Sequence, residues 1–364
     1  MAAREQIQLF LWNTDYLMER LAVPGGLAQY LGEFIVQFFV KSVYGALWYA
    51  ALLVAVQLLT WRLTGKQKFY LLSFVPSCSL WYLACNPIIP MTPIVAVLLT
   101  IGLMNLLPKH QNARWMVAFV MIPVGYWLLG PAMVLLALYL LFTRGANLLL
   151  KSIPLILLAF CVVGSSWLVP YPLKQIARGV DYYWEKESMG SYDEMEYDMQ
   201  MRRQHRDEII EKYNHKGSQS LSVNNAVLVV MWQQQRISQQ EVVARINLDQ
   251  RALQNIPSAF LMSELCMPMG MVNMSQRAAF EAMEAIPNYN KSARALQLLV
   301  ETNLITGNPK VAMKYISLLE QTTFYRGWAR KMKLMATQPE QLKNNSFLYQ
   351  LKEIYDNDKD MLFY

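Results

Sequence analysis

The chain has 364 residues, of which 54% are hydrophobic and 16% are charged, and its formal net charge is +7. No run of Lys and Arg lies beside an aromatic ladder, so the positive charge does not indicate a nucleic-acid partner. The four cysteines match neither a disulfide framework nor a zinc pattern, and the sequence predicts no metal site and no cofactor. Residues 42–170 are almost uncharged, whereas residues 171–364 are polar and long enough for a separate domain.

Residues 1–41 are predicted to form one or two external amphipathic helices at a membrane surface. Apolar residues recur at helical spacing over residues 6–21 and again over residues 27–40, and Pro24-Gly25-Gly26 separates the two stretches. Arg4 and Glu5 are among the charged residues that interrupt any signal-peptide core. The pattern favours helices that lie on the bilayer or pack on the spans.

Residues 42–170 are predicted to form a polytopic α-helical membrane domain of about six spans. A span needs roughly 20 apolar residues, and the candidates are residues 43–61, 69–84, 93–107, 115–129, 131–142 and 148–169. Gly130-Pro131 divides two short candidates, which are either two tight spans or a re-entrant pair. No Asp or Glu occurs between Val43 and Val169. This argues against a proton- or sodium-coupled transporter, because such proteins use intramembrane carboxylates.

Basic residues predict the orientation of the spans. They gather in alternate connections, at Arg62, Lys66, Lys68, Lys109, His110, Arg114, Arg144 and Lys151, whereas residues 86–92 and 130–131 carry none. The positive-inside rule places the basic connections in the cytoplasm. The sequence therefore predicts a multi-pass protein of the bacterial inner membrane, with residues 1–41 and a C-terminal domain in the periplasm. Lys174, Arg178, Tyr182, Tyr183 and Trp184 are predicted to lie at the membrane interface.

Residues 171–364 are predicted to form a periplasmic helical domain. One charged helix is expected over residues 194–213, and helices over residues 239–246, 292–305 and 309–322 follow from the signals Ser238, Gly307 and Pro309. Two of these helices form a pair whose facing residues are predicted to be Leu296, Leu299, Asn303, Ala312, Ile316 and Leu319. A spacing of about 34 residues between similar helices is typical of tetratricopeptide repeats. The alternative is a helical domain packed on the spans.

Two long segments carry a family resemblance: EQIQLFLWNTDYLMERLAVPGGLAQYLGEFIVQFF near the start and LITGNPKVAMKYISLLEQTTFYRGWA near the end. With the six expected spans, they resemble a bacterial family of multi-span inner-membrane proteins of unknown function. The resemblance implies an all-α fold, in which a tetratricopeptide-like solenoid follows the membrane domain. It also implies that relatives have an additional span before EQIQLF. The resemblance does not identify any catalytic residue in this sequence.

Two classes of function follow. The first is a scaffold of envelope biogenesis, anchored in the lipid bilayer and binding a protein partner through the C-terminal helices. The alternative is an envelope enzyme, a glycosyltransferase acting on a lipid-linked donor, with an acidic residue on an outer segment as base or metal ligand. Its candidate catalytic residues are Asp15, Glu19 and Glu33.

Overall fold

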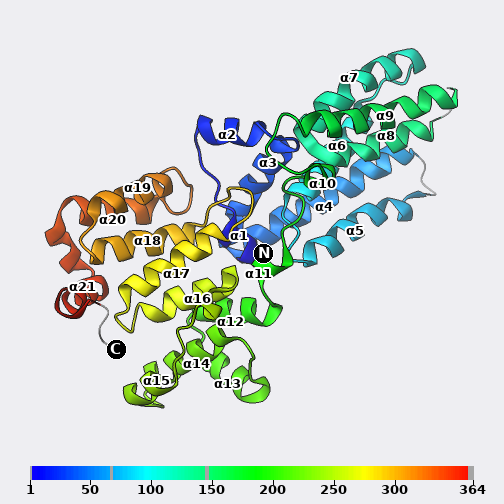
Figure 1. Cartoon of the computed structure of the whole chain (residues 1–364). Coiled ribbons are helices and arrows are strands. Elements are labelled where there is room, and N and C mark those ends of the chain that lie inside the picture. The colour runs from blue at the N-terminus through cyan, green and yellow to red at the C-terminus, as the bar shows by residue number, and fades with distance from the viewer. Residues whose placement is uncertain (1, 66–68, 144–146, 360–364) are drawn as a thin grey trace. The chain divides into compact units, whose positions relative to one another are not determined.

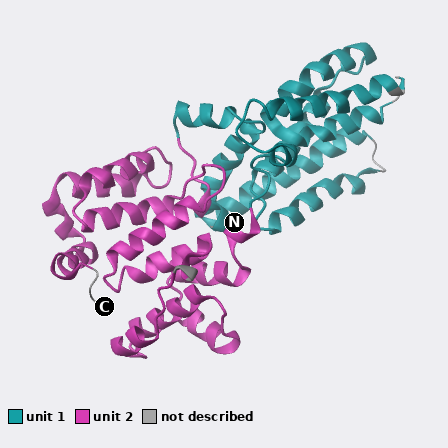
Figure 2. Cartoon of the chain, in the orientation of Figure 1, with its two compact units in different colours: residues 1, 3–5, 12–184 teal, residues 2, 6–11, 185–364 magenta. Residues whose placement is uncertain are grey.

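Helices and their connections make up the described part of the computed structural model, residues 2–65, 69–143 and 147–359, with no β-strand there. The predicted all-α fold class is confirmed. Contacts divide the chain into two units (Figure 2): the first comprises Trp12–Trp184 with Ala3–Glu5, and the second comprises Glu185–Tyr364 with Gln6–Leu11. The boundary between the two units therefore follows residue 184, whereas the sequence predicts a boundary after residue 170. Lys66, Lys68 and Arg144 of the orientation argument lie outside the described residues.

The first unit follows the predicted apolar segments (Figure 1). Its elements are α2 (Thr14–Leu21), α3 (Gly26–Val36), η1 (Gln37–Val40), α4 (Ser42–Thr64), η3 (Leu71–Ser73), α5 (Phe74–Cys85), α6 (Thr92–Leu106), α7 (Gln111–Leu129), η4 (Gly130–Met133), α8 (Val134–Leu141), α9 (Leu148–Ser165) and α10 (Leu173–Arg178). Among the described residues, two helical stretches are long and apolar enough to cross a membrane by length and composition, Ser42–Thr64 and Gln111–Leu141.

The second of these stretches is interrupted at Gly130. This glycine has φ 69° and ψ −151°, a conformation outside the helical region that glycine adopts without steric cost. A Cβ atom on Gly125 would come within 2.5 Å of the Met133 side chain, which a continuous straight helix would hold about 12 Å further along its axis. The chain therefore turns back here, and α7 and α8 are separate helices.

Polar side chains inside the first unit tie its apolar helices together. Gln57 Nε2 donates to Ser73 Oγ at 3.0 Å, and Ser77 Oγ donates to the Leu53 carbonyl at 2.9 Å. Arg4, which is 3% exposed, donates to the carbonyl oxygens of Ala84, Asn86 and Ile89 at 2.7–2.8 Å. The guanidinium group thereby satisfies carbonyls at the C-terminal end of α5, where a cation is favoured.

The second unit is built from short helices that pack in sequence. They are α11 (Lys186–Met189), α12 (Tyr192–Arg202), α13 (Arg206–Lys216), α14 (Leu221–Gln233), α15 (Gln239–Arg245), η5 (Gln250–Leu253), α16 (Ile256–Cys266), α17 (Val272–Glu284), α18 (Ala293–Ile305), α19 (Pro309–Glu320), α20 (Arg326–Thr337), η6 (Pro339–Asn344) and α21 (Ser346–Asp358). From α16 to α20 each helix packs against the next (Figure 1). Helix α1 (Ala2–Ile7) contributes residues to both units.

Local capping explains where several of these helices begin. Ser238 caps the start of α15 and Pro309 is in the first turn of α19, as the sequence predicts, and Glu241 completes a capping box with Ser238. The helix expected over residues 194–213 is instead two helices. Gln204, at φ 59°, lies in the left-handed region and separates α12 from α13.

Glu194 joins three elements of the second unit. Its carboxylate accepts hydrogen bonds from Ser191 at the start of α12, from Ser220 before α14 at 2.8 Å, and from Ser258 of α16 at 3.0 Å. Burial alone would raise the pKa of Glu194, but these bonds outweigh it and lower the pKa. The ionised carboxylate is therefore the stabilised form, and it fixes the start of α12 against α14 and α16.

Candidate functional site

A cavity of about 460 Å³ opens in the second unit. Its apolar lining comes from α12, the end of α16, α18 and α21, and consists of Met201, Met267, Pro268, Leu298 and Phe347. Its polar lining consists of Arg202, Gln204, Arg206, Gln233, Glu264 and Glu301. An apolar cavity with a few polar groups is the usual form of a ligand site.

The two signs of charge enter the cavity from different elements. The turn between α12 and α13 supplies Arg202 and Arg206 on either side of Gln204, whose left-handed backbone makes the turn. Helices α16 and α18 supply Glu264 and Glu301. Residues held in sparsely populated backbone conformations often accompany functional sites. The cavity is thus dipolar, with guanidinium groups from one turn and carboxyl groups from two helices.

One face of α18 carries residues of the cavity lining and of a buried polar network. Arg294, Leu298 and Glu301 are spaced four and three residues apart, so they share a face. Phe260 and Glu264 of α16 and Met267, which follows its last residue, have the same spacing. These two faces bring an arginine, two carboxyl groups and an apolar surface into one neighbourhood.

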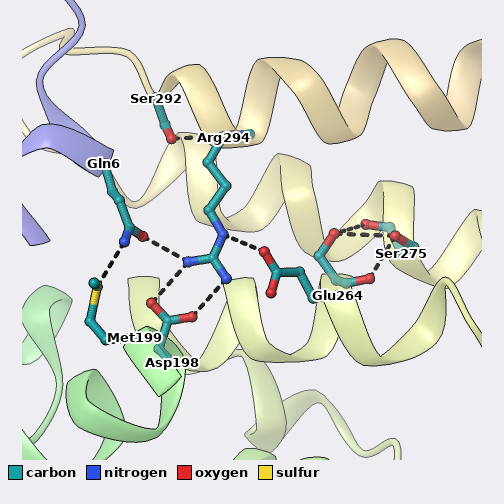
Figure 3. A network of polar contacts seen from close by, with 9 residues as sticks. Gln6, Asp198, Met199, Glu264, Ser275, Ser292 and Arg294 are labelled. Atoms are coloured by element: carbon teal, nitrogen blue, oxygen red, sulfur yellow. Dashed lines mark hydrogen bonds and ion pairs between the residues drawn. The ribbon is translucent and has the colours of Figure 1, made fainter. Parts of the chain in front are cut away.

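Arg294 is the centre of a buried polar network (Figure 3) and is 4% exposed. Its Nε donates to Glu264 Oε1 at 2.7 Å, and its Nη1 donates to Asp198 Oδ2 at 2.9 Å and to Gln6 Oε1 at 2.7 Å. The guanidinium carbon lies 4.4 Å from the centre of the Phe260 ring. Asp198 and Glu264 therefore share one guanidinium cation.

The network shows that burial and pairing compete. Burial raises the pKa of Asp198, and the charge of Arg294 offsets only part of that effect. Burial disfavours the cation of Arg294, but Asp198 and Glu264 reverse this and raise its pKa. Arg294 is therefore charged at any physiological pH, and Asp198 depends on it to stay ionised.

Glu301 differs from the other carboxyl groups. Among the described residues, no hydrogen bond or ion pair is formed by its side chain, although it is half-buried beside the cavity. Burial, and secondarily the neighbouring Glu264 carboxylate, raise the pKa of Glu301 to about 7. Unfolded glutamate ionises near pH 4.3, so the contribution of Glu301 to folding stability falls as the pH rises from about 4.3 to about 7. A strongly shifted carboxyl group in a cavity is a candidate functional group.

The N-terminal segment is part of this unit. Gln6 contacts Arg294 and also donates to Met199 Sδ at 3.1 Å (Figure 3). The residues after it are buried: Ile7, Leu9, Phe10 and Leu11 are 1–5% exposed. The sequence predicts a surface helix here, but α1 ends at Ile7 and residues 8–12 are not helical.

The carboxylates predicted for an enzyme lie elsewhere, in the first unit. Asp15 and Glu19 are exposed on α2, whereas Glu33 is 0% exposed. Arg20 Nε donates to Glu33 Oε2 at 2.9 Å, and Gln29 Nε2 donates to Glu33 Oε1 at 3.0 Å. The Tyr16 hydroxyl also donates to Oε2. Glu33 thus holds α2 on α3, and Arg20 also lies 3.7 Å from Glu19, so one guanidinium group contacts both Glu19 and Glu33.

The residues predicted at the membrane interface have two different environments. Lys174 and Arg178 are exposed, whereas Trp184 is 2% exposed. The Trp184 backbone N–H donates to the Ile88 carbonyl at 2.8 Å, and the Tyr182 hydroxyl donates to the Leu129 carbonyl. Tyr183 lies 5.8 Å beneath the Arg178 guanidinium. Tyr182 and Trp184 therefore pack the segment after α10 against the first unit.

The predicted helix pair is buried. Helices α18 and α19 lie side by side, and the six residues assigned to their contact are 0–4% exposed: Leu296, Leu299, Asn303, Ala312, Ile316 and Leu319. Asn303 Nδ2 donates back to the Leu299 carbonyl at 2.6 Å, so its polar group is satisfied within α18. Within residues 2–65, 69–143 and 147–359, no group of three or more His, Cys, Asp or Glu could hold a metal ion.

Comparison with other proteins identifies the family to which the chain belongs. No curated protein and no solved structure matches the chain significantly. The whole chain, residues 1–364, matches the family described as "Family of unknown function (DUF6057)". The protein, with its helical fold and its charged cavity, therefore belongs to this family of unknown function.

Proposed function

We propose that the first unit anchors the protein in the bacterial inner membrane and that the second unit binds a protein partner in its cavity. The protein would then be a scaffold of envelope biogenesis. The cavity is the observation that supports partner binding, because it combines an apolar lining with four charged groups.

The surface of the first unit supports the membrane anchor. Among the described residues, exposed large hydrophobic side chains lie mainly in this unit, and Leu71, Tyr82, Phe142, Leu149 and Phe160 are 71–82% exposed. In α4, only 28% of the most apolar 18-residue window is buried. Apolar surface of this extent is costly in water and favourable in lipid. We infer that α7 and α8, which lie within Gln111–Leu141, and the shorter apolar helices α5, α6 and α9 are also embedded, shielded by their neighbours.

The orientation is part of the proposal. The C-terminal ends of α4 and α8 and the N-terminal ends of α5 and α9 lie at one end of the first unit (Figure 1). Arg62 and Lys151 flank these connections, so the basic groups gather on one side. The positive-inside rule makes that side cytoplasmic, which puts the second unit in the periplasm.

The succession of helices supports a binding role for the second unit. Helices α16 to α20 pack consecutively, as in tetratricopeptide-like solenoids, and α14, α16 and α18 contribute to the cavity. Alternate helices of such an array line its concave face, where partners bind. Asp15 and Glu19 are exposed and Glu33 is bound to Arg20, which favours a structural role for these carboxylates, so we propose the scaffold rather than an envelope enzyme.

A pair of phenylalanine variants tests partner binding. Phe347 lines the cavity at 47% exposure, and Phe280 of α17 is outside the cavity lining at 41% exposure. We expect Phe347→Ser to reduce capture of a specific membrane or envelope protein at least tenfold when the full chain is purified in detergent, because aromatic groups in interfaces dominate affinity. Phe280→Ser is the control and should retain capture. Equal capture by both variants would contradict the proposal.

A further inference from the structure

Within the part of the chain that the structure describes, the Glu301 side chain has no positive partner. The charged groups that face the cavity with it are Glu264 from α16, Arg202 from α12 and Arg206 from α13, while α14 contributes the neutral Gln233 and α21 contributes Phe347. Arg294, on the same face of α18, is already bound to Glu264 and Asp198. A half-buried carboxylate without a bound cation is costly, and a ligand that supplies a cation removes that cost.

We propose that the cavity receives a basic side chain, an arginine or lysine of the partner, and that Glu301 is the carboxylate that binds it. This inference rests on the proposed function and specifies its chemistry. The long aliphatic part of such a side chain fits the apolar lining formed by Leu298, Met267 and Phe347, while the charged head reaches Glu301. A volume of about 460 Å³ is within the range of sites that enclose groups of this size.

Glu264 makes a second contribution to this recognition. One of its carboxyl oxygens accepts from Arg294, and the side chain also borders the cavity. Its negative charge raises the free energy of an ionised Glu301 in the empty site. A bound cation relieves that repulsion, so Glu264 favours the occupied state.

Ligand binding should therefore depend on pH. With a pKa of about 7, the empty site holds a neutral Glu301 below neutral pH and an ionised Glu301 above it. Arginine and lysine side chains stay charged throughout this range. Binding of a cation to the ionised form releases a proton, so affinity should rise about tenfold from pH 6 to pH 8.

The test uses the full chain in detergent and two small probes. N-acetyl-arginine amide carries the guanidinium group, and N-acetyl-citrulline amide is its neutral isostere. We expect ligand-observed NMR titrations to give an arginine-probe Kd that falls about tenfold from pH 6 to pH 8. The citrulline probe should bind at least tenfold more weakly at pH 8. Glu301→Gln should remove both the pH dependence and the preference for arginine.

Glu284→Gln is the matched control, because Glu284 is an exposed glutamate of α17 that does not line the cavity. It should behave as the unaltered chain does. Equal binding of the two probes, a pH-independent Kd, an unaffected Glu301→Gln variant or no arginine binding would each overturn the inference. Partner capture that depends on Phe347 but not on Glu301 would overturn it while leaving the scaffold proposal intact.

Discussion

Replacing Arg294 with methionine should destabilise the second unit by about 3–5 kcal/mol, the cost of leaving buried charges without their partner. Asp198 and Glu264 would both lose the guanidinium cation that they share, and Gln6 would lose its donor. Pulse proteolysis of the full chain in detergent, across a urea series, measures the free energy of unfolding of this unit. Arg294→Lys should recover only part of the loss, because an ammonium cannot reproduce the geometry of the guanidinium.

Arg277→Met is the control for that measurement. Arg277 is 49% exposed and lies 3.8 Å from Glu281, so its loss should cost less than about 0.5 kcal/mol. Adding Asp198→Asn to Arg294→Met should restore part of the stability, since it removes one of the two uncompensated charges. The cost of Arg294→Met should also shrink as the pH falls, because burial raises the pKa of Asp198 and protonation removes its charge. Equal losses for Arg294→Met and Arg277→Met would refute this role.

The second large effect is expected at Phe10. This ring is 1% exposed and belongs to a non-helical segment whose contacts group it with the second unit, more than 170 residues before the rest of that unit. Phe10→Ala should destabilise the second unit by about 3–5 kcal/mol, since it leaves a cavity and removes apolar burial. Hydrogen exchange of the α18 amides in the full chain should accelerate accordingly.

Phe280→Ala is the control substitution for Phe10→Ala. Phe280 is 41% exposed in the same unit and contacts Tyr315 at a ring distance of 6.5 Å, so a loss of at most about 1 kcal/mol is expected. If Phe10→Ala left the exchange of α18 unchanged, residues 6–11 would not be part of the core of the second unit.

Local sequence signals predict much of the helical layout. Ser238 and Pro309 mark helix starts that the structure confirms, because capping depends on residues within one turn. Gln204 shows the limit of such signals. Nothing in its neighbourhood requires a left-handed residue, so the sequence predicts a single helix where α12 and α13 are separate.

The candidate site was not predictable in the same way. The face formed by Arg294, Leu298 and Glu301 is visible as a four-and-three spacing, but charged residues on a helix usually face water. Their burial depends on α16, on Asp198 and on Gln6, the last of which is 288 positions away in the sequence. Long-range packing decides which charged face is buried, and a single helical pattern does not contain that information.

Photocrosslinking in intact cells tests the central claim, that a partner occupies the cavity. A benzophenone amino acid at position 347 should give one discrete crosslinked product, because the side chain at that position borders the cavity. The same group at position 280, which is also exposed in the second unit, should not give that product. The absence of a product at position 347, or the same product from both positions, would contradict the claim.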